Sequence, residues 1–239
     1  ILPGFLAHWS FPDRARIRIA QFFRRALPIT YPQEPPVKTV LDTRQRILDT
    51  AADLIWARSY GTVSMDDICE RAKVNKGSLY HYFASKSDLA IAVFDEHWRA
   101  AEIELKHAFS QENPPLSRFD RFCDYVVQRQ ATRSSRIGIV CGCPHDTVGS
   151  ELGTQDQNIR AKVAEILTNK QLYFESALRD LVAEGLLTEE EIPTVARHIQ
   201  AYVMGTLSLA RIENDLAILH DLKKGIARIL GVAALTVVA

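Results

Sequence analysis

Beyond the first forty residues, apolar side chains recur every three or four positions, which is the spacing of amphipathic α-helices. Ile47, Ala51 and Ile55 mark the apolar face of a first helix over about 42–58, which Gly61 follows. The same spacing predicts further helices over about 65–72, 76–83, 86–109, 116–133, 156–185, 189–212 and 216–230. No segment alternates apolar and polar residues with a period of two, and no internal repeat is visible. The pattern therefore predicts an all-α fold.

Two segments do not follow the helical pattern. The stretch 137–153 is rich in glycine, and a short helix or a loop fits it equally well. Residues 1–40 hold six prolines and a cluster of arginines at Arg14, Arg16, Arg18, Arg24 and Arg25. Two interpretations of this first segment remain open: a leader that is mobile or docks loosely, or a basic arm that touches a DNA backbone.

The segment from Ser64 to Phe83 has the signals of two short helices joined by a tight turn. Ser64 is a good N-cap, and Asp67 stands three residues later, as in a capping box. A turn at Lys73-Val74 follows, and Asn75 is placed to cap the next helix. This arrangement predicts a helix-turn-helix, although the same pattern also occurs in helical bundles that bind nothing.

The residue types on the second helix suit contact with DNA. Gly77 permits close approach of the backbone, and Lys76 is able to reach a phosphate or a guanine. Tyr80 and Tyr82 offer hydroxyl groups on rigid rings, and Lys86 opens the following helix near the same surface. The sequence therefore indicates a compact DNA-reading surface.

Composition and charge narrow the class of protein. Apolar residues make up 47% and charged residues 24% of the 239 residues, which is ordinary for a globular protein. Lys and Arg number 29, as do Asp and Glu, so only local clusters of charge are able to attract nucleic acid. We find no apolar run of about 18 residues and no ordered signal peptide. We therefore expect a cytoplasmic protein without a membrane partner.

Three stretches together closely resemble the TetR family of transcriptional regulators. They are 43–55, 60–68 and 77–89, and the last has the sequence GSLYHYFASKSDL. The resemblance implies a three-helix DNA-binding domain over 41–90 and a helical ligand-binding and dimerisation domain over 91–239. It further implies a homodimer that binds a palindromic double-stranded DNA operator, most often as a repressor, and that a small-molecule effector releases. No cofactor is expected.

Carried over by position, the resemblance implies a set of DNA contacts. They are Arg44, Ser64, Met65, Lys76, Gly77, Ser78, Tyr80, His81, Tyr82 and Lys86. One position departs from the family pattern, because Lys73 stands where the family usually has glycine in the turn. A left-handed backbone at a residue other than glycine costs roughly 1–2 kcal/mol, which leaves the fold prediction intact.

The C-terminal half is expected to hold the dimer surface and a ligand pocket. The last two long helices would pair between subunits through a face built by Val195, Ile199, Tyr202, Val203, Thr206 and Ala210, where the small residues Ala201, Gly205 and Ala210 permit close approach. The alternative is that this face packs only within its own subunit. The pocket would lie among the helices between 86 and 185, with His97 and His107 as further polar anchors. Its candidate ligand-binding residues are Trp98, Phe122, Cys123, Tyr125, Cys143, His145 and Tyr173.

The cluster Cys141-Gly142-Cys143-Pro144-His145 has three interpretations. The thiols are buried structural groups near the pocket, or they sense oxidants or electrophiles, or they bind a metal. The last lacks a clear fourth ligand, so we predict no metal site. An enzyme is not predicted either, because His145 is the one base near Cys143 and no phosphate-binding loop or nucleophile elbow occurs. The alternative function is therefore a thiol-based sensor that uses Cys141 and Cys143.

Overall fold

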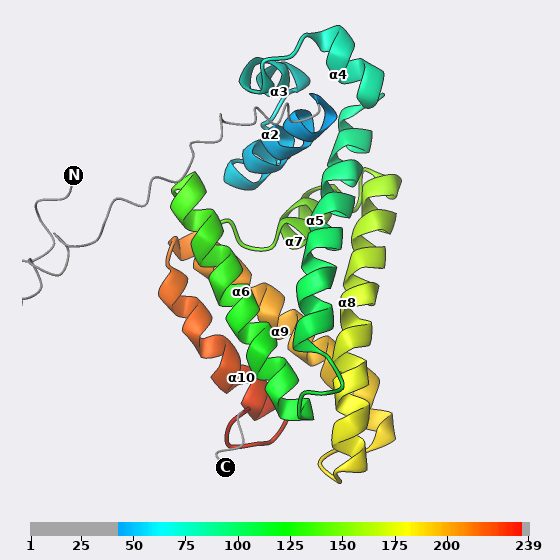
Figure 1. The fold of residues 1–239 in the computed structure, drawn as a ribbon, viewed down its shortest axis with the longest axis vertical. Coiled ribbons are helices and arrows are strands. Elements are labelled where there is room, and N and C mark those ends of the chain that lie inside the picture. The colour runs from blue at the N-terminus through cyan, green and yellow to red at the C-terminus, as the bar shows by residue number, and fades with distance from the viewer. Residues whose placement is uncertain (1–42, 236–239) are drawn as a thin grey trace, which may run out of the picture. The chain divides into compact units, whose positions relative to one another are not determined.

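The computed structural model describes residues 43–235, which form α-helices, short 3-10 helices, turns and loops, with no strand in that range. The all-α prediction is thereby confirmed, whereas the predicted leader or arm over 1–40 lies outside the described residues. Figure 1 shows the helices, which are α2 (Thr43–Ala57), α3 (Met65–Ala72), α4 (Lys76–Tyr82), α5 (Lys86–Ala108), α6 (Pro115–Ile137), α7 (Pro144–Leu152), α8 (Gln157–Ala183), η1 (Glu189–Glu191), α9 (Ile192–Glu213), η2 (Leu216–Asp221) and α10 (Leu222–Ile229).

The turn between α3 and α4 forms as the sequence predicts. Ser64 accepts a hydrogen bond from the Asp67 amide at 3.1 Å, and the Asp67 carboxylate accepts one from the Ser64 amide at 2.8 Å. Lys73 ends α3 in the left-handed conformation, with φ 54° and ψ 51°. Asn75 then caps α4 by accepting a hydrogen bond from the Ser78 amide at 2.7 Å. The capping residues thus fix both ends of the turn, and the helix-turn-helix is confirmed.

The structure settles the ambiguous stretch 137–153 and shifts several helix boundaries; α6, for example, extends to Ile137 where an end near 133 was expected. Within 137–153 the helix α7 begins only at Pro144, because Gly138 and Gly142 take left-handed backbone angles that an α-helix does not tolerate. The helix expected from residue 189 starts with the 3-10 turn η1 and becomes α9 at Ile192. The helix expected over 216–230 divides in the same way, into η2 and α10.

Two hydrophobic clusters hold the helices together, and α5 belongs to both. The first lies under α2, α3 and α4 and extends into α7 and the first turns of α8 through Val148, Ile159 and Val163. The second joins the end of α5 to α6, α8, α9 and α10. Because α5 runs without a break across residue 90, the division into domains over 41–90 and 91–239 stays a prediction.

The face of α9 that was predicted to form the dimer surface is instead buried within its own chain. Buried are Val195, Ile199, Val203, Thr206 and Ala210, while Tyr202 is half-buried. The prediction of that face is therefore wrong, because α9 packs between α8 and α10 and uses its most apolar side there. The opposite side of α9 is exposed and carries Ala201, Gly205, Leu209 and Ile212.

Candidate functional site

The outer side of α4 presents polar and aromatic groups to solvent, while Leu79 and Phe83 point into the core. Tyr80 is 50% exposed and Tyr82 is 39% exposed, which is high for large aromatic side chains. Of the ten predicted DNA contacts, the exposed ones are Ser64, Lys76, Gly77, Tyr80, His81 and Tyr82, and the half-buried ones are Arg44, Met65, Ser78 and Lys86. Most of these residues thus lie on α3 and α4, which adjoin the N-terminal end of α5 (Figure 1).

Several of these polar groups already have partners within the chain. The Lys76 ammonium lies 2.8 Å from the Asp66 carboxylate, and this hydrogen bond raises the pKa of Lys76. Lys86 donates a hydrogen bond of 2.5 Å to the Tyr60 carbonyl and lies 4.0 Å from the centre of the Tyr60 ring. Contact of Lys86 with a phosphate would therefore require that it leave the Tyr60 carbonyl or share it.

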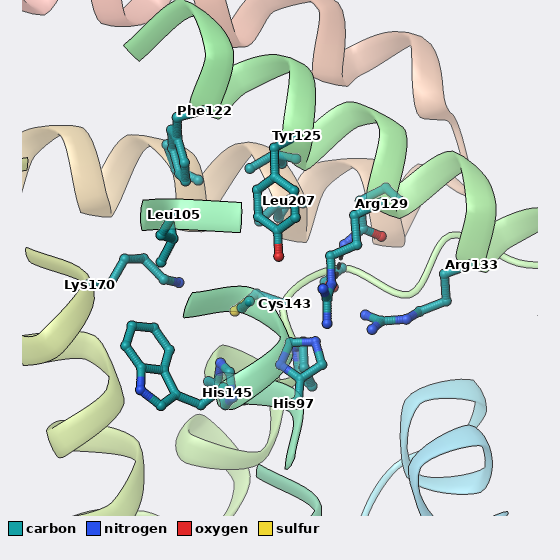
Figure 2. Close-up of a pocket in the computed structure, with 17 residues that line it drawn as sticks. His97, Leu105, Phe122, Tyr125, Arg129, Arg133, Cys143, His145, Lys170 and Leu207 are labelled. Carbon is teal, nitrogen blue, oxygen red and sulfur yellow. Dashed lines mark hydrogen bonds between the residues drawn. The ribbon is translucent and has the colours of Figure 1, made fainter. Parts of the chain in front are cut away.

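A cavity of about 70 Å³ lies between α5, α6, α8, α9 and the start of α7 (Figure 2). Its lining consists of His97, Trp98, Ala101, Leu105, Phe122, Tyr125, Val126, Arg129, Gln130, Arg133, Gly142, Cys143, Pro144, His145, Lys170, Val203 and Leu207. Five of the predicted ligand-binding residues are among them, namely Trp98, Phe122, Tyr125, Cys143 and His145. The contribution of α9, through Val203 and Leu207, was not expected from the sequence.

Two predicted ligand-binding residues do not line this cavity. Cys123 follows Phe122 by one position, which rotates its side chain by about 100° around α6 and into the core. Burial there raises the pKa of the Cys123 thiol to about 12. Tyr173 points to α5, where its hydroxyl donates a hydrogen bond of 3.5 Å to the Glu102 carboxylate.

The cavity also has three basic residues that were not predicted from the sequence, Arg129, Arg133 and Lys170. A signal for the first two exists, because Phe122, Val126, Arg129 and Arg133 follow one another at spacings of four, three and four on α6. Such a stripe places the arginines in line with the buried face of the helix. A charged residue on an apolar stripe is unusual enough to mark a candidate site.

Burial perturbs the charged and titratable groups of the cavity. Burial lowers the pKa of Arg133 to about 10, and the positive charge of the neighbouring Arg129 contributes to this shift. The Arg133 guanidinium lies 4.3 Å from the centre of the Trp56 ring. His97 and His145 lie with ring centres 5.0 Å apart, and burial holds the pKa of both well below the ordinary value. Both imidazoles are therefore neutral near pH 7.

The helix α7 connects the cavity wall to the helix-turn-helix. Its N-terminal residues Pro144 and His145 line the cavity. Near its other end, Glu151 accepts a hydrogen bond of 2.7 Å from the Gly61 amide, in the loop that precedes α3. The nine residues of α7 span about 13 Å. One short helix thus links the cavity wall to the helix-turn-helix.

Arg211 on α9 makes a second connection. Its guanidinium donates hydrogen bonds to the carbonyls of Trp56 at 3.2 Å, Arg58 at 2.9 Å and Cys141 at 2.6 Å. The first two carbonyls lie at the C-terminal end of α2, where helical carbonyls lack partners within the helix. Arg211 therefore ties α9 and the loop before α7 to the first helix of the helix-turn-helix.

The thiols differ in their surroundings. Cys141 is fully buried, and burial raises the pKa of its thiol, whereas Cys143 lines the cavity. Among residues 43–235, no group of three or more His, Cys, Asp or Glu side chains is placed to hold a metal ion. The same residues include no helix with the length and apolarity needed to cross a membrane.

Comparison with known proteins identifies similar chains. Residues 47–93 match the family model described as bacterial regulatory proteins, tetR family. A relative from Lactococcus lactis subsp. lactis, an HTH-type transcriptional regulator in the lacX 3′ region, is 28% identical over 186 residues, which cover 77% of this chain and 91% of the relative.

Two solved structures share the fold. The regulatory protein TetR from Rhodobacter sphaeroides superposes with a TM-score of 0.70 at 24% identity, over 78% of this chain and 98% of that one. The reduced form of NemR from E. coli superposes with a TM-score of 0.65 at 23% identity, over 82% of this chain and 100% of that one. These likenesses show that the chain shares its fold with both proteins.

Proposed function

Because the chain belongs to the TetR family of bacterial regulatory proteins, we propose that it is a repressor that binds a palindromic operator as a homodimer and leaves it when a small-molecule effector binds. The observation that carries this proposal is α7, which lines the cavity at one end and is bonded to the helix-turn-helix at the other. Binding an operator also requires that the protein act in the cytoplasm.

The proposed DNA-reading residues are those on and beside α4. Tyr80 and Tyr82 are exposed and held on a short helix, so their rings lose little freedom on contact with DNA. Lys76 supplies positive charge, and DNA phosphate would compete with Asp66 for it. The net charge of zero means that affinity depends on these few contacts and on their duplication in a dimer.

The proposed dimer surface is the exposed side of α9. Leu209 is 51% exposed and Ile212 is 78% exposed, and Gly205 has open space around it. Small residues at Ala201 and Gly205 would let a second copy approach closely. In such a dimer the two α4 helices would read successive major grooves, about 34–36 Å apart.

The proposed release mechanism acts through α5 and α7. Both helices line the cavity, and α5 begins at Lys86, beside the helix-turn-helix. Ser87 also donates a hydrogen bond of 2.7 Å to Asp156, which caps α8. An effector that binds better to a state in which these helices have shifted would draw the protein away from its DNA-binding state.

DNA binding is tested with variants that keep the fold. A DNA fragment selected by the protein from a random library serves as the probe, in an electrophoretic shift assay at several salt concentrations. We expect Lys76→Ala to weaken binding and to reduce the salt slope by about one, because one phosphate contact is lost. Lys224→Ala is the matched control, since Lys224 is an exposed lysine on α10. If the Lys76→Ala and Tyr80→Ala variants bound DNA as tightly as the Lys224→Ala control, the proposed DNA-reading surface would be contradicted.

The thiol-sensor alternative rests on one observation, the position of Cys143 in the cavity wall, with its sulfur directed to the cavity (Figure 2). The burial of Cys141 disfavours a mechanism that needs both thiolates, because a raised pKa reduces the reactive fraction. Separate Cys141→Ser and Cys143→Ser variants, treated with an electrophile before the DNA-binding assay, distinguish the two mechanisms. Loss of the response in the Cys143→Ser variant alone supports sensing, and an unchanged response in both variants removes it.

A further inference from the structure

The cavity beside α7 is lined by cations that have no carboxylate of their own. Arg129 and Arg133 lie one turn apart on α6, and Lys170 enters from α8 (Figure 2). None of the residues that line the cavity is acidic. Within the described part of the chain, neither arginine nor Lys170 forms an ion pair. Like charges held this close raise the electrostatic energy of the empty cavity.

Buried nitrogen atoms around the cavity also lack hydrogen-bond partners. The Nε atom of Arg129, both ring nitrogens of His97 and Nε2 of His145 are shielded from solvent and make no hydrogen bond. The residue His145 as a whole is only 2% exposed, whereas His97 is half-buried although its nitrogens are covered. Each neutral imidazole carries one N–H, and leaving it unpaired in the interior is unfavourable. The Oε1 atom of Gln130, which also lines the cavity, is an unpaired acceptor, but the cationic donors outnumber it. An anion is therefore the group that satisfies the most donors.

Carboxylates of the chain border two other grooves that the same arginines line. Glu104 borders the first with Arg129 and Arg133, and Asp49, Asp53 and Glu96 border the second. Asp53 is already paired with Arg136. The side of the arginines that faces the cavity is left without a negative partner.

The rest of the cavity is apolar and small. Leu105, Phe122 and Leu207 contribute apolar side chains to the lining, and these side chains cannot hydrogen-bond to a hydrated ion. A cavity of about 70 Å³ has room for about five to seven water-sized groups, since one water needs about 10–15 Å³ of such space. The ligand that fits these observations has one anionic group and a short apolar body.

We propose that the effector is a small organic carboxylate, held by Arg129 and Arg133 with His97, His145 and Lys170 around it and with its apolar part against Phe122. A carboxylate matches the planar fork of donors on a guanidinium, which favours two parallel hydrogen bonds. The regulatory consequence of this binding rests on the function proposed above, whereas the binding itself does not depend on DNA.

The direct test is isothermal titration calorimetry of the whole chain without DNA. The probes are straight-chain carboxylates of two to six carbons, their primary amides as neutral matches, and inorganic phosphate. We expect at least one carboxylate to bind about tenfold to hundredfold more tightly than its amide, because a charge-assisted hydrogen bond contributes that much. Tighter binding of the amides, binding of phosphate alone, or no binding by any carboxylate would overturn the proposal.

Variants locate the binding site. Arg129→Gln removes the charge, and we expect it to weaken carboxylate binding about tenfold or more. Arg129→Lys keeps the charge but loses the fork, so an intermediate affinity is expected. Arg136→Gln is the control, because Arg136 is exposed on the same helix and pairs with Asp53. Equal carboxylate affinity in the parent and the Arg129→Gln variant would place binding elsewhere and overturn the proposal. If circular dichroism shows that the Arg129→Gln variant is unfolded, the Lys170→Met variant, whose substitution lies on a different helix, is tested instead.

The same carboxylates, added to the protein–DNA complex, separate this inference from the proposed function. Binding by calorimetry without release of DNA would support the carboxylate site and contradict the induction mechanism. Release of DNA by neutral compounds, with no carboxylate bound, would support induction and overturn the carboxylate site.

Discussion

Replacing Arg211 by alanine is expected to loosen the connection between α9 and the helix-turn-helix. The guanidinium now satisfies three carbonyls, those of Trp56, Arg58 and Cys141. Removing it leaves the Cys141 carbonyl without this donor in a fully buried residue, whereas water is able to replace the bond at the exposed Arg58. The substitution therefore costs less free energy than the sum of the three hydrogen bonds.

The size of the effect follows from those contacts. A hydrogen bond to a charged group contributes about 1.5–3 kcal/mol, and the buried bond to Cys141 counts fully. With smaller contributions from the other two bonds, we expect Arg211→Ala to lower the free energy of unfolding by about 2–3 kcal/mol. For a urea dependence of about 2 kcal/mol per molar, the unfolding midpoint falls by about 1 M.

The assay is urea unfolding followed by circular dichroism, at one fixed protein concentration because a dimer is stabilised by its own concentration. Arg228→Ala is the control, since Arg228 is an exposed arginine on α10. The connecting role of Arg211 would be refuted if the Arg211→Ala and Arg228→Ala variants unfolded at the same urea concentration and if Arg211→Ala left DNA affinity and effector response unchanged.

Further predictions concern packing, pH and the thiols. Gly225→Ala should lower stability by about 1–3 kcal/mol in thermal unfolding, because a Cβ there overlaps the Tyr202 ring; an undiminished melting temperature would contradict this. Burial lowers the pKa of His97 and His145, so the unfolded chain takes up their protons first and stability should fall as the pH falls below about 6.5. Urea midpoints at pH 7.5 and 5.5 check this, and replacing both histidines by phenylalanine should flatten the difference. Cys123, with its pKa raised to about 12, should resist a thiol reagent at pH 8 until urea unfolds the chain, as peptide mass spectrometry would show.

The fold was predictable from the sequence wherever local chemistry dictates it. Ser64, Asp67 and Asn75 are capping residues whose effect depends on backbone groups two or three positions away, so α3 and α4 begin where the sequence predicts. Lys73 was expected in a left-handed conformation and takes it. The glycine-rich stretch before α7 was ambiguous because several backbone paths fit glycine, and tertiary contacts select among them.

The candidate cavity was predictable only in part. Aromatic residues such as Trp98 and Phe122 were found because apolar pockets need them, but the composition of a helix does not say which side faces a cavity. Cys123 illustrates this, since one position along α6 separates cavity from core. The dimer face was placed on the most apolar side of α9, and that side is also the one its own chain buries. Which partner covers an apolar face is a property of the assembled fold, not of the helix alone.

In the proposed mechanism, occupancy of the cavity lowers the affinity of the protein for DNA. The most direct measurement is the fluorescence anisotropy of a labelled, library-selected DNA fragment bound to the protein, titrated with a compound shown by calorimetry to bind in the cavity. We expect saturation of the cavity to weaken DNA binding at least about tenfold, a coupling of about 1.4 kcal/mol. We also expect Glu151→Ala, which removes the hydrogen bond to the Gly61 amide, to diminish this effect. An unchanged DNA affinity at full occupancy of the cavity in the parent protein would contradict the proposed release mechanism.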